Sequence, residues 1–300
     1  MNVAITGGSG FIGQALTDHL IKQGHQVIIL TRNKNNKPVK ENVTYVEWLK
    51  ESASAEKQLQ NIDAFVNLAG ENLNSGRWTA KKKQEILNSR IAATREVISL
   101  IAKLDKKPEV LVNGSAVGYY GMSKHATYTE DTEEPGEDFL ATVVKNWEQE
   151  AAEAQQMTRV VYTRFGVVLD QKEGALKKML PPFKIGLGGK LGSGEQWMSW
   201  VHINDAARAI IHCIETPTIK GAVNVTAPHP QRMKEFGKAL AATLNRPFWT
   251  PVPGVALKTL LGEMSMLVLE GQKVLPKKLE DHQFIFKYAH LHSALEDLLK

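Results

Sequence analysis

The sequence predicts an α/β fold, in which a doubly wound parallel sheet is followed by a smaller C-terminal α+β domain. Three observations support this prediction. Short apolar runs rich in Val and Ile alternate with amphipathic helical patterns through the first part of the chain. A glycine-rich turn joins the first apolar run to the first helical pattern. From residue 171 the regular alternation stops, and a segment dense in glycine follows.

The first strand, residues 1–5, runs directly into this turn, and a helix is predicted for residues 12–22. A strand, a glycine-rich turn and a helix open a Rossmann-type dinucleotide-binding unit, because glycines allow the backbone to approach a diphosphate closely. The helix N-terminus then offers free N–H groups to the phosphates. A flexible loop is the alternative, which the flanking strand and helix disfavour. The residues expected to bind the cofactor here are Gly7, Gly8, Ser9, Gly10, Phe11, Ile12 and Gly13.

The end of the second strand, residues 26–31, indicates which dinucleotide is bound. An NAD-preferring unit places an acidic residue here for the ribose 2′-hydroxyl. This chain instead has Thr31 and Arg32, and no acidic residue follows before Glu41. Because a guanidinium pairs well with a 2′-phosphate, we expect NADP(H) to be preferred over NAD(H). The alternative is that Arg32 belongs to a solvated basic loop.

The remaining elements of the first part follow the same apolar patterns. One face of the long helix at 79–103 carries apolar residues at helical spacing and is expected to pack on the sheet. The predicted strands are 43–48, 63–70, 109–115, 159–169 and 221–226, and the predicted helices are 52–60, 79–103 and 139–155.

The C-terminal part is less regular. Residues 186–194 contain five glycines in nine positions and are predicted to form a hairpin or flap. Helices are expected at 233–244 and 254–270, and the alternation of Phe284, Phe286 and Tyr288 predicts a strand. We expect a nucleotide-binding domain made of residues 1–170 and 197–226. The smaller, substrate-binding domain would then comprise residues 171–196 and 227–300.

Several motifs resemble those of the extended short-chain dehydrogenase/reductase (SDR) family. The turn has the spacing Gly-x-x-Gly-x-x-Gly, residues 67–70 read Asn-Leu-Ala-Gly, and residues 115–121 resemble Ser-x-x-x-Val-Tyr-Gly. With Trp78, Trp147-Glu148 and the C-terminal part, the chain resembles an atypical subgroup of the NAD-dependent epimerase/dehydratase superfamily, the "epimerase family proteins" with a C-terminal domain of unknown function. The resemblance implies NADP(H) as cofactor but no particular substrate.

The resemblance also implies roles for single residues. The small residues Leu68, Ala69 and Gly70 would let the backbone pass over the cofactor, and Arg90 is assigned to the cofactor as well. Ser115 stands where the family has its substrate-binding Ser or Thr. His202, in a Val-His-Val-x-Asp-like segment, is expected to fix a strand-to-helix turn rather than to catalyse.

The usual SDR acid/base pair, a Tyr-x-x-x-Lys on one helix face, is missing from its expected place. Alignment puts Leu140 and Val144 there, and neither can transfer a proton. Lys145, at the next position, faces another direction of the helix. A Tyr-x-x-x-Lys does occur at Tyr120 and Lys124, but in a glycine-containing loop, where we interpret it as a chance match.

Other polar residues are candidates for the substrate side. Ser115 would hydrogen-bond the reacting oxygen, and Tyr120, Tyr119 or a water would move the proton. Arginines in such a pocket would suit a carboxylate or phosphate, although each is as readily structural. The candidate substrate-binding residues are Arg77, Arg164, Gln196 and Trp197, with Asn72 as a further polar candidate.

Composition excludes several functions. A net charge of +5 without a basic cluster interleaved with aromatic residues argues against nucleic acid. No apolar run reaches the ~18 residues of a membrane span. Scattered histidines predict no metal site, and no Gly-x-Ser-x-Gly of a hydrolase occurs. The single Cys213 and the strand at the N-terminus, which leaves no room for a signal peptide, indicate a cytoplasmic protein.

Two functions therefore stay open. The first is an NADP(H)-dependent oxidoreductase or epimerase of the extended SDR type acting on an unknown small polar substrate, either nucleotide-linked or a carbonyl compound. The second is a non-catalytic NADP(H)-binding sensor or regulatory protein, which the missing acid/base pair would suit. By analogy with SDR proteins, a homodimer through residues 79–103 and 139–155 is the candidate assembly.

Overall fold

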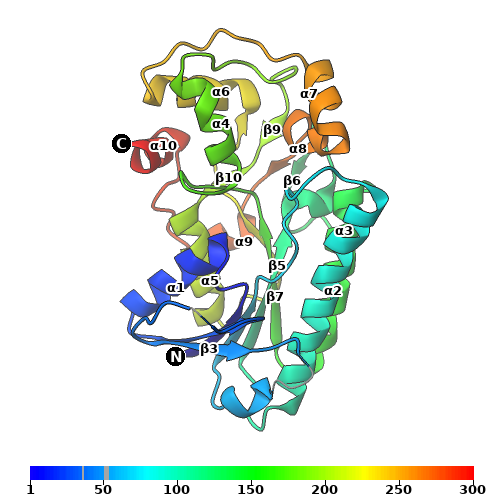
Figure 1. Cartoon of the computed structure of the whole chain (residues 1–300), viewed down its shortest axis with the longest axis vertical. Coiled ribbons are helices and arrows are strands. Elements are labelled where there is room, and N and C mark those ends of the chain that lie inside the picture. Colours follow the sequence, from blue (N-terminus) through cyan, green and yellow to red (C-terminus); the bar gives the residue numbers. More distant parts are fainter. Residues whose placement is uncertain (36, 51–53) are drawn as a thin grey trace.

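A seven-stranded parallel sheet forms the centre of the protein, as the sequence predicts (Figure 1). The computed structural model describes residues 1–35, 37–50 and 54–300. The strand order is β11-β7-β5-β4-β1-β2-β3. The strands are β1 (Asn2–Thr6), β2 (Gln26–Thr31), β3 (Val43–Glu47), β4 (Ala64–Asn67), β5 (Val110–Ala116), β7 (Arg159–Phe165) and β11 (Gly221–Val225).

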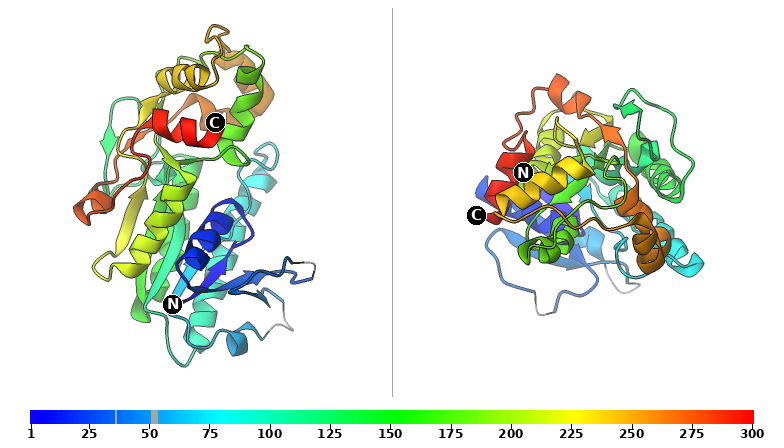
Figure 2. Two further views of the ribbon diagram at one scale, coloured as in Figure 1. Left: turned by 90° about the vertical axis from the view of Figure 1, so that its left-hand side faces the viewer. Right: turned by 90° about the horizontal axis from the view of Figure 1, so that it is seen from above.

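Helices cover both faces of this sheet (Figures 1 and 2). The helices α1 (Phe11–Lys22) and α5 (Ile203–Glu215) pack together on one face, and α2 (Ala80–Lys103) and α3 (Phe139–Ala152) pack together on the other. Alternate residues of a strand point to opposite faces of the sheet. Val3 and Ile5 belong to the core under α1 and α5, whereas Ala4 belongs to the core under α2. Both faces are therefore buried, as in a doubly wound fold.

The strand order places a topological switch point at the centre of the sheet. From β1 the chain moves outward to β2 and β3, and it then returns to β4 on the other side of β1. In open α/β sheets a ligand binds in the crevice that such a reversal leaves at the carboxyl ends of the strands. The last residues of the two central strands, Thr6 and Asn67, lie side by side at this edge.

The C-terminal part stands above the carboxyl edge of the sheet and has its own apolar core (Figure 1). Trp200, Phe236 and Leu295 are fully buried there. Three two-stranded pairs, β10–β8, β12–β9 and β13–β6, connect this part to the segments that leave the sheet. The remaining elements are η1 (Ala55–Gln58), η2 (Val117–Tyr120), β6 (Thr127–Tyr128), η3 (Glu153–Gln156), β8 (Val167–Leu169), α4 (Gly174–Lys184), β9 (Trp197–Met198), β10 (Trp200–His202), β12 (Gln231–Arg232), α6 (Met233–Thr243), α7 (Gly254–Leu261), η4 (Gly262–Ser265), α8 (Met266–Leu269), β13 (Lys273–Val274), α9 (Lys277–Asp281) and α10 (Leu291–Leu299).

Some predicted elements are divided. The strand expected at 159–169 ends at Phe165 and resumes as β8, which pairs with β10 outside the main sheet. A side chain at Gly166 would place its Cβ 2.4 Å from the carbonyl oxygen of Ser199, so only glycine allows this close passage. The helix expected at 254–270 is broken into three short helices at Gly262, whose φ is +60°. Of the helix expected at 52–60, only a 3-10 turn at residues 55–58 forms, and residues 52 and 53 lie outside the described residues.

The strand predicted from Phe284, Phe286 and Tyr288 is wrong. The segment is irregular, and its backbone is held by the buried carboxylate of Asp205 on α5. The backbone N–H of Tyr288 donates to Asp205 Oδ2 at 2.8 Å, and that of Lys287 donates to Oδ1 at 3.1 Å. The aromatic alternation therefore reflects packing onto a helix rather than a place in a sheet.

The glycine-rich segment is not a hairpin of its own. It lies against residues 249–252, where the N–H of Val252 donates to the carbonyl of Lys190 at 2.8 Å. A Cβ at Gly189 would be 1.8 Å from the carbonyl oxygen of Thr250, so glycine is needed for this contact. Within the described ranges, no helix is both long enough and apolar enough to cross a membrane.

Candidate functional site

The glycine turn after β1 is shaped by close backbone contacts. At Gly7, whose φ is +70°, a Cβ would lie 2.6 Å from the carbonyl oxygen of Leu68. At Gly13 a Cβ would lie 2.3 Å from the carbonyl oxygen of Gly7, so glycine lets α1 start directly against the turn. Gly10 is the N-cap of α1, and no side chain caps the helix. The first N–H groups of α1 are thus left for a ligand, which the positive end of the helix favours when it is an anion.

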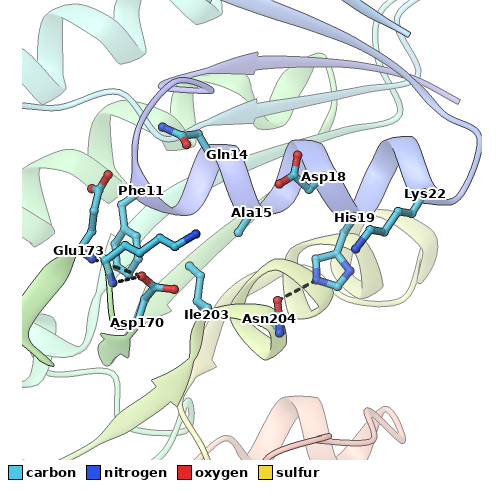
Figure 3. A pocket seen from close by; sticks show the side chains of 11 residues that line it. Phe11, Gln14, Ala15, Asp18, His19, Lys22, Asp170, Glu173, Ile203 and Asn204 are labelled. Atoms are coloured by element: carbon cyan, nitrogen blue, oxygen red, sulfur yellow. Dashed lines mark hydrogen bonds between the residues drawn. The ribbon is translucent and has the colours of Figure 1, made fainter. Parts of the chain in front are cut away.

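In the predicted cofactor set, the side chains of Phe11, Thr31 and Arg32 lie in different environments. The ring of Phe11 lines a hollow between α1 and α5 and packs beside Gly174, where a Cβ would lie 3.2 Å from the Phe11 ring (Figure 3). Only the backbone of Phe11 can therefore contact a diphosphate. Thr31 is buried at the end of β2, and the side chain of Arg32 beyond it is exposed.

Arg90 of α2 lies beneath the chain that leaves β4. A Cβ at Gly70 would be 3.1 Å from Cγ of Arg90, so the two residues are in direct contact. The Nη1 atom of Arg90 donates to the carbonyl oxygens of Ile86 at 2.9 Å and Glu71 at 3.1 Å, and the guanidinium lies 5.1 Å from the ring centroid of Trp147. Burial lowers the pKa of Arg90 to about 10. No carboxylate among the described residues forms an ion pair with it, so this cation is available to an anionic ligand.

A chain of buried polar side chains lies under the crevice. Thr6 donates to Asn67 Oδ1 at 2.6 Å, and Asn67 Nδ2 donates to Asn113 Oδ1 at 2.7 Å and to Thr94 Oγ1 at 3.0 Å. Trp147 Nε1 also donates to Thr94 Oγ1, at 3.1 Å. We call these five residues the polar chain. The sequence analysis missed it, although polar residues at the ends of apolar strands are a signal that could have found it.

Ser115 and Arg164, both predicted site residues, meet at the carboxylate of Glu148. Ser115 Oγ donates to Glu148 Oε1 at 2.6 Å. Arg164 donates from Nε to Oε1 and from Nη2 to Oε2, each at 2.8 Å. All three side chains are buried. Burial disfavours the charge of Arg164, but the hydrogen bonds and charge of Glu148 outweigh burial and raise the pKa of the guanidinium.

The two tyrosines after β5 are held by the protein itself. Tyr120 is buried, and its hydroxyl donates to Asn224 Oδ1 at 2.7 Å. Burial raises the pKa of Tyr120 to about 12. The Tyr119 hydroxyl donates to the carbonyl oxygen of Glu133 at 2.6 Å, and its ring centroid lies 3.4 Å from the guanidinium carbon of Arg164.

Three other predicted substrate residues contact backbone carbonyls. Arg77 Nη2 donates to Leu260 at 3.0 Å, near the end of α7. Gln196 is buried, and its Nε2 donates to Val268 at 2.8 Å. Trp197 Nε1 donates to Lys124 at 3.1 Å, and the guanidinium carbon of Arg232 lies 3.9 Å from the Trp197 ring centroid. These contacts connect the segments above the sheet to one another.

Comparison with known proteins identifies the family. Residues 3–226 match the NAD dependent epimerase/dehydratase family. The chain belongs to this family. Residues 252–298 match a domain of unknown function, DUF1731. The epimerase family protein YfhF of Bacillus subtilis is 50% identical over 300 residues, which span 100% of this chain and 98% of that protein. An epimerase family protein of Staphylococcus aureus strain MRSA252 is 44% identical over 98% of each chain.

A solved structure agrees with this assignment. The human epimerase family protein SDR39U1 (isoform 2), crystallised with NADPH, superposes with a TM-score of 0.89. It is 34% identical in sequence, and the match covers 99% of both chains. The likeness therefore extends through the C-terminal part as well as the sheet.

Within this family framework, the positions aligned with the usual Tyr and Lys hold apolar side chains. Leu140 and Val144 are buried on α3, and Lys145 is exposed. Tyr120 lies in the 3-10 turn η2 and Lys124 in an irregular segment, so no helix brings them together.

His202 fixes the turn from β10 to α5, as predicted. Its Nδ1 accepts the N–H of Asn204 at 3.1 Å and so caps α5. Its ring stacks on Tyr288 with a centroid distance of 3.8 Å, and Nε2 lies 3.2 Å from Asp297 Oδ2.

This buried histidine predicts an acid-sensitive fold. Burial lowers the pKa of His202 below 6.5, against the attraction of Asp297 and Asp205. Below about pH 6.5 the unfolded chain binds more protons than the folded one, so the free energy of unfolding falls as the pH drops. Between pH 7.5 and pH 5 we therefore expect His202 to lower the free energy of unfolding. Urea unfolding at both pH values measures this change in the free energy of unfolding, with His202→Asn as the comparison. An equal loss in the variant would contradict the assignment.

A second hollow lies between α1, the start of α5 and the segment that follows β8 (Figure 3). Its lining mixes both charges: Asp18 and Lys22 lie on α1, Asp170 lies at the other end of the hollow, and His19 Nε2 contacts Asn204 Oδ1 at 3.3 Å. Of its lining residues, the sequence analysis assigned a role only to Phe11, as part of the cofactor site. Among the described residues, no group of three or more His, Cys, Asp or Glu is arranged to hold a metal ion.

Proposed function

We propose that the protein is an NADP(H)-dependent oxidoreductase or epimerase acting on a small polar substrate. The observation that carries the proposal is the half-buried guanidinium of Arg90 beneath the chain leaving β4, which forms no ion pair with a carboxylate of the described residues, although the charge of Glu71 acts on it. Together with the uncapped N-terminus of α1, it makes the crevice suitable for a phosphorylated ligand. The NADPH in the structure of the human relative supports the same ligand class.

The cofactor would be held from both sides of β1. The backbone of residues 7–13 would bind the diphosphate at the start of α1, and the backbone of Leu68, Ala69 and Gly70 would pass over the cofactor. Arg32, exposed at the end of β2, would pair with the 2′-phosphate and so favour NADP(H) over NAD(H). When bound, the nicotinamide supplies or accepts the hydride.

On the substrate side, we assign the contact with the reacting oxygen to Ser115. Because Ser115 donates its hydrogen to Glu148, the Oγ lone pairs remain to accept a hydrogen bond from a substrate hydroxyl. The sequence analysis named Tyr120, Tyr119 or a water as the group that would transfer the proton. A pKa of about 12 and the bond to Asn224 disfavour Tyr120 at neutral pH, which favours the water. Arg77, Gln196 and Trp197 would shape the wall of the substrate site.

The test of cofactor binding is a calorimetric titration with NADPH, NADH and their oxidised forms. For Arg32→Asp we expect NADPH binding to weaken about tenfold or more, with little loss for NADH, because the variant removes the partner of the 2′-phosphate and adds a repelling charge. Lys178→Asp is the control, since it makes the same charge change on an exposed position of α4. Failure of the wild-type protein to bind any dinucleotide would refute the proposal.

The second candidate is a non-catalytic NADP(H)-binding sensor. What favours it is that Leu140 and Val144, which the sequence alignment puts in place of the usual acid/base residues, are apolar and buried. Ser115→Ala and Tyr120→Phe distinguish the two functions. In an enzyme, Ser115→Ala abolishes turnover and leaves NADPH affinity unchanged. If both variants keep the full activity of the wild-type protein, the assigned site is wrong.

A further inference from the structure

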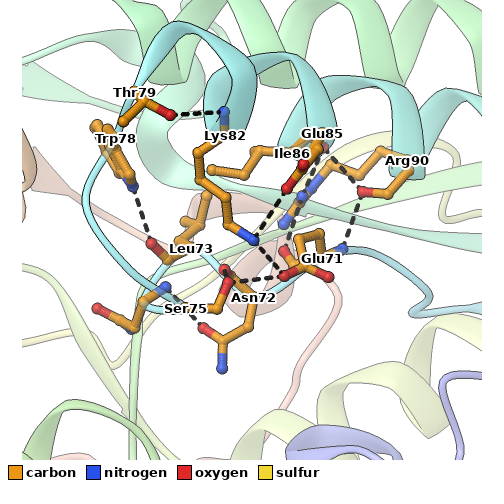
Figure 4. Close-up of polar contacts among 12 residues, drawn as sticks. Glu71, Asn72, Leu73, Ser75, Trp78, Thr79, Lys82, Glu85, Ile86 and Arg90 are labelled. Carbon is orange, nitrogen blue, oxygen red and sulfur yellow. Dashed lines mark hydrogen bonds and ion pairs between the residues drawn. The ribbon is translucent and has the colours of Figure 1, made fainter.

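The segment from Glu71 to Trp78 connects the carboxyl end of β4 to α2 (Figure 4). Glu71 follows Gly70 directly, so it stands at the edge of the proposed cofactor crevice. Its backbone is held on both sides: its N–H donates to Ser89 Oγ at 3.0 Å, and its carbonyl accepts from Arg90 Nη1 at 3.1 Å. The position of this residue is therefore set by α2.

The Glu71 carboxylate has two close partners (Figure 4). Lys82 Nζ lies 2.6 Å from Oε1, and the Ser75 hydroxyl donates to the same oxygen at 2.7 Å. Lys82 also approaches Glu85 Oε2, at the longer distance of 3.4 Å. The Lys82 side chain is only 15% exposed, whereas that of Glu71 is 40% exposed. The lysine thus lies behind the carboxylate, and the carboxylate is the more open of the two.

The charge of Arg32 acts on the same carboxylate. The hydrogen bond from Lys82, then that from Ser75, lowers the pKa of Glu71, and the charges of Lys82 and Arg32 lower it further. Arg32 follows β2 and Glu71 follows the strand β4, and these strands flank β1 and its glycine turn. An acidic side chain therefore shares the neighbourhood of the cation that we assign to the 2′-phosphate.

A carboxylate beside the phosphates of a dinucleotide opposes binding, and it also competes for Arg32. Lys82 removes this conflict if its ammonium cancels the charge of Glu71. We propose that Glu71 and Lys82 form a matched pair that sets the affinity for 2′-phosphorylated dinucleotides: Lys82 neutralises Glu71 and leaves Arg32 available for the 2′-phosphate. The inference rests on the proposed function, because it concerns the same ligand.

The experiment is a calorimetric titration of the full chain with NADPH and NADH at low salt. In Lys82→Met the negative charge of Glu71 is no longer neutralised. We therefore expect NADPH affinity to fall about five- to tenfold, with a smaller loss for NADH. Glu71→Gln keeps or improves the wild-type affinity for NADPH. The double variant returns to within about twofold of Glu71→Gln, because the charge that Lys82 neutralised is gone.

Three comparisons separate this role from a purely structural one. Lys81→Met removes an exposed neighbouring charge and leaves affinity unchanged. Lys82→Arg keeps the charge and restores NADPH binding, and the loss in Lys82→Met shrinks at higher ionic strength. Melting temperatures of all variants show whether the fold is retained.

The inference is overturned if the double variant binds NADPH as weakly as Lys82→Met, or if NADPH and NADH lose affinity equally. Both results would mean that the pair only positions the segment 71–78. Wild-type protein that binds neither dinucleotide would overturn the proposed function as well, which makes the two failures distinguishable.

Discussion

Gly13→Ala is expected to abolish dinucleotide binding. The added Cβ would lie 2.3 Å from the carbonyl oxygen of Gly7 and 2.7 Å from Cα of Gly8, both rigid backbone atoms. The first turn of α1 must then move away from the glycine turn, and its N–H groups lose their position for the diphosphate. We expect NADPH affinity to fall about a hundredfold or more, equivalent to ~2.7 kcal/mol, measured by calorimetry.

Gly254→Ala is the matched control for this variant. Its Cβ would meet only ordinary contacts, the nearest being Leu269 Cδ2 at 3.6 Å, at the start of α7. The control should bind NADPH like the wild-type protein, and circular dichroism should show the same fold in both variants. Gly13→Ala protein that binds NADPH with wild-type affinity would show that the turn does not hold the cofactor.

Glu148→Ala is expected to have the largest effect on stability. The substitution removes the carboxylate that accepts two hydrogen bonds from the buried guanidinium of Arg164. It also leaves the Ser115 hydroxyl without its acceptor. Removing one partner of a buried ion pair costs about 3–5 kcal/mol of unfolding free energy. Urea unfolding at neutral pH measures the loss.

The neighbouring ion pair on the same helix provides the control. Glu150 pairs with Arg95, whose side chain is 69% exposed, so Glu150→Ala should cost only about 0–1 kcal/mol. In the double variant Glu148→Ala, Arg164→Met, part of the lost stability should return, because the buried charge is gone as well. Equal losses in Glu148→Ala and Glu150→Ala would contradict the buried network.

The sheet could be predicted from the sequence because its signals are local. Val3, Ala4 and Ile5 show the apolar run of a strand buried on both faces, and the glycines that follow specify the turn by their spacing alone. The strand predicted around Phe286 failed for the opposite reason. Its backbone partner is a carboxylate on α5, which no local pattern reveals.

In the candidate site, too, the local features could be predicted from the sequence and the long-range contacts could not. The glycine turn was found, since all of its parts are contiguous. The partner of Ser115 was not, because Glu148 lies 33 residues away and its apolar neighbours give the helix an ordinary amphipathic pattern. Likewise Thr94 fits the core face of α2 by spacing, although its hydroxyl joins the polar chain.

The polar chain has a mechanical consequence. Its hydrogen bonds link the last residues of β1 and β4 and the middle of β5 to α2 and α3, so none of these five elements can slide without breaking a buried bond. The sheet edge below the crevice is thus a stiff platform that keeps one shape whatever lies on it. Adjustment to a substrate must come from the segments above, and substitutions that change substrate choice belong there.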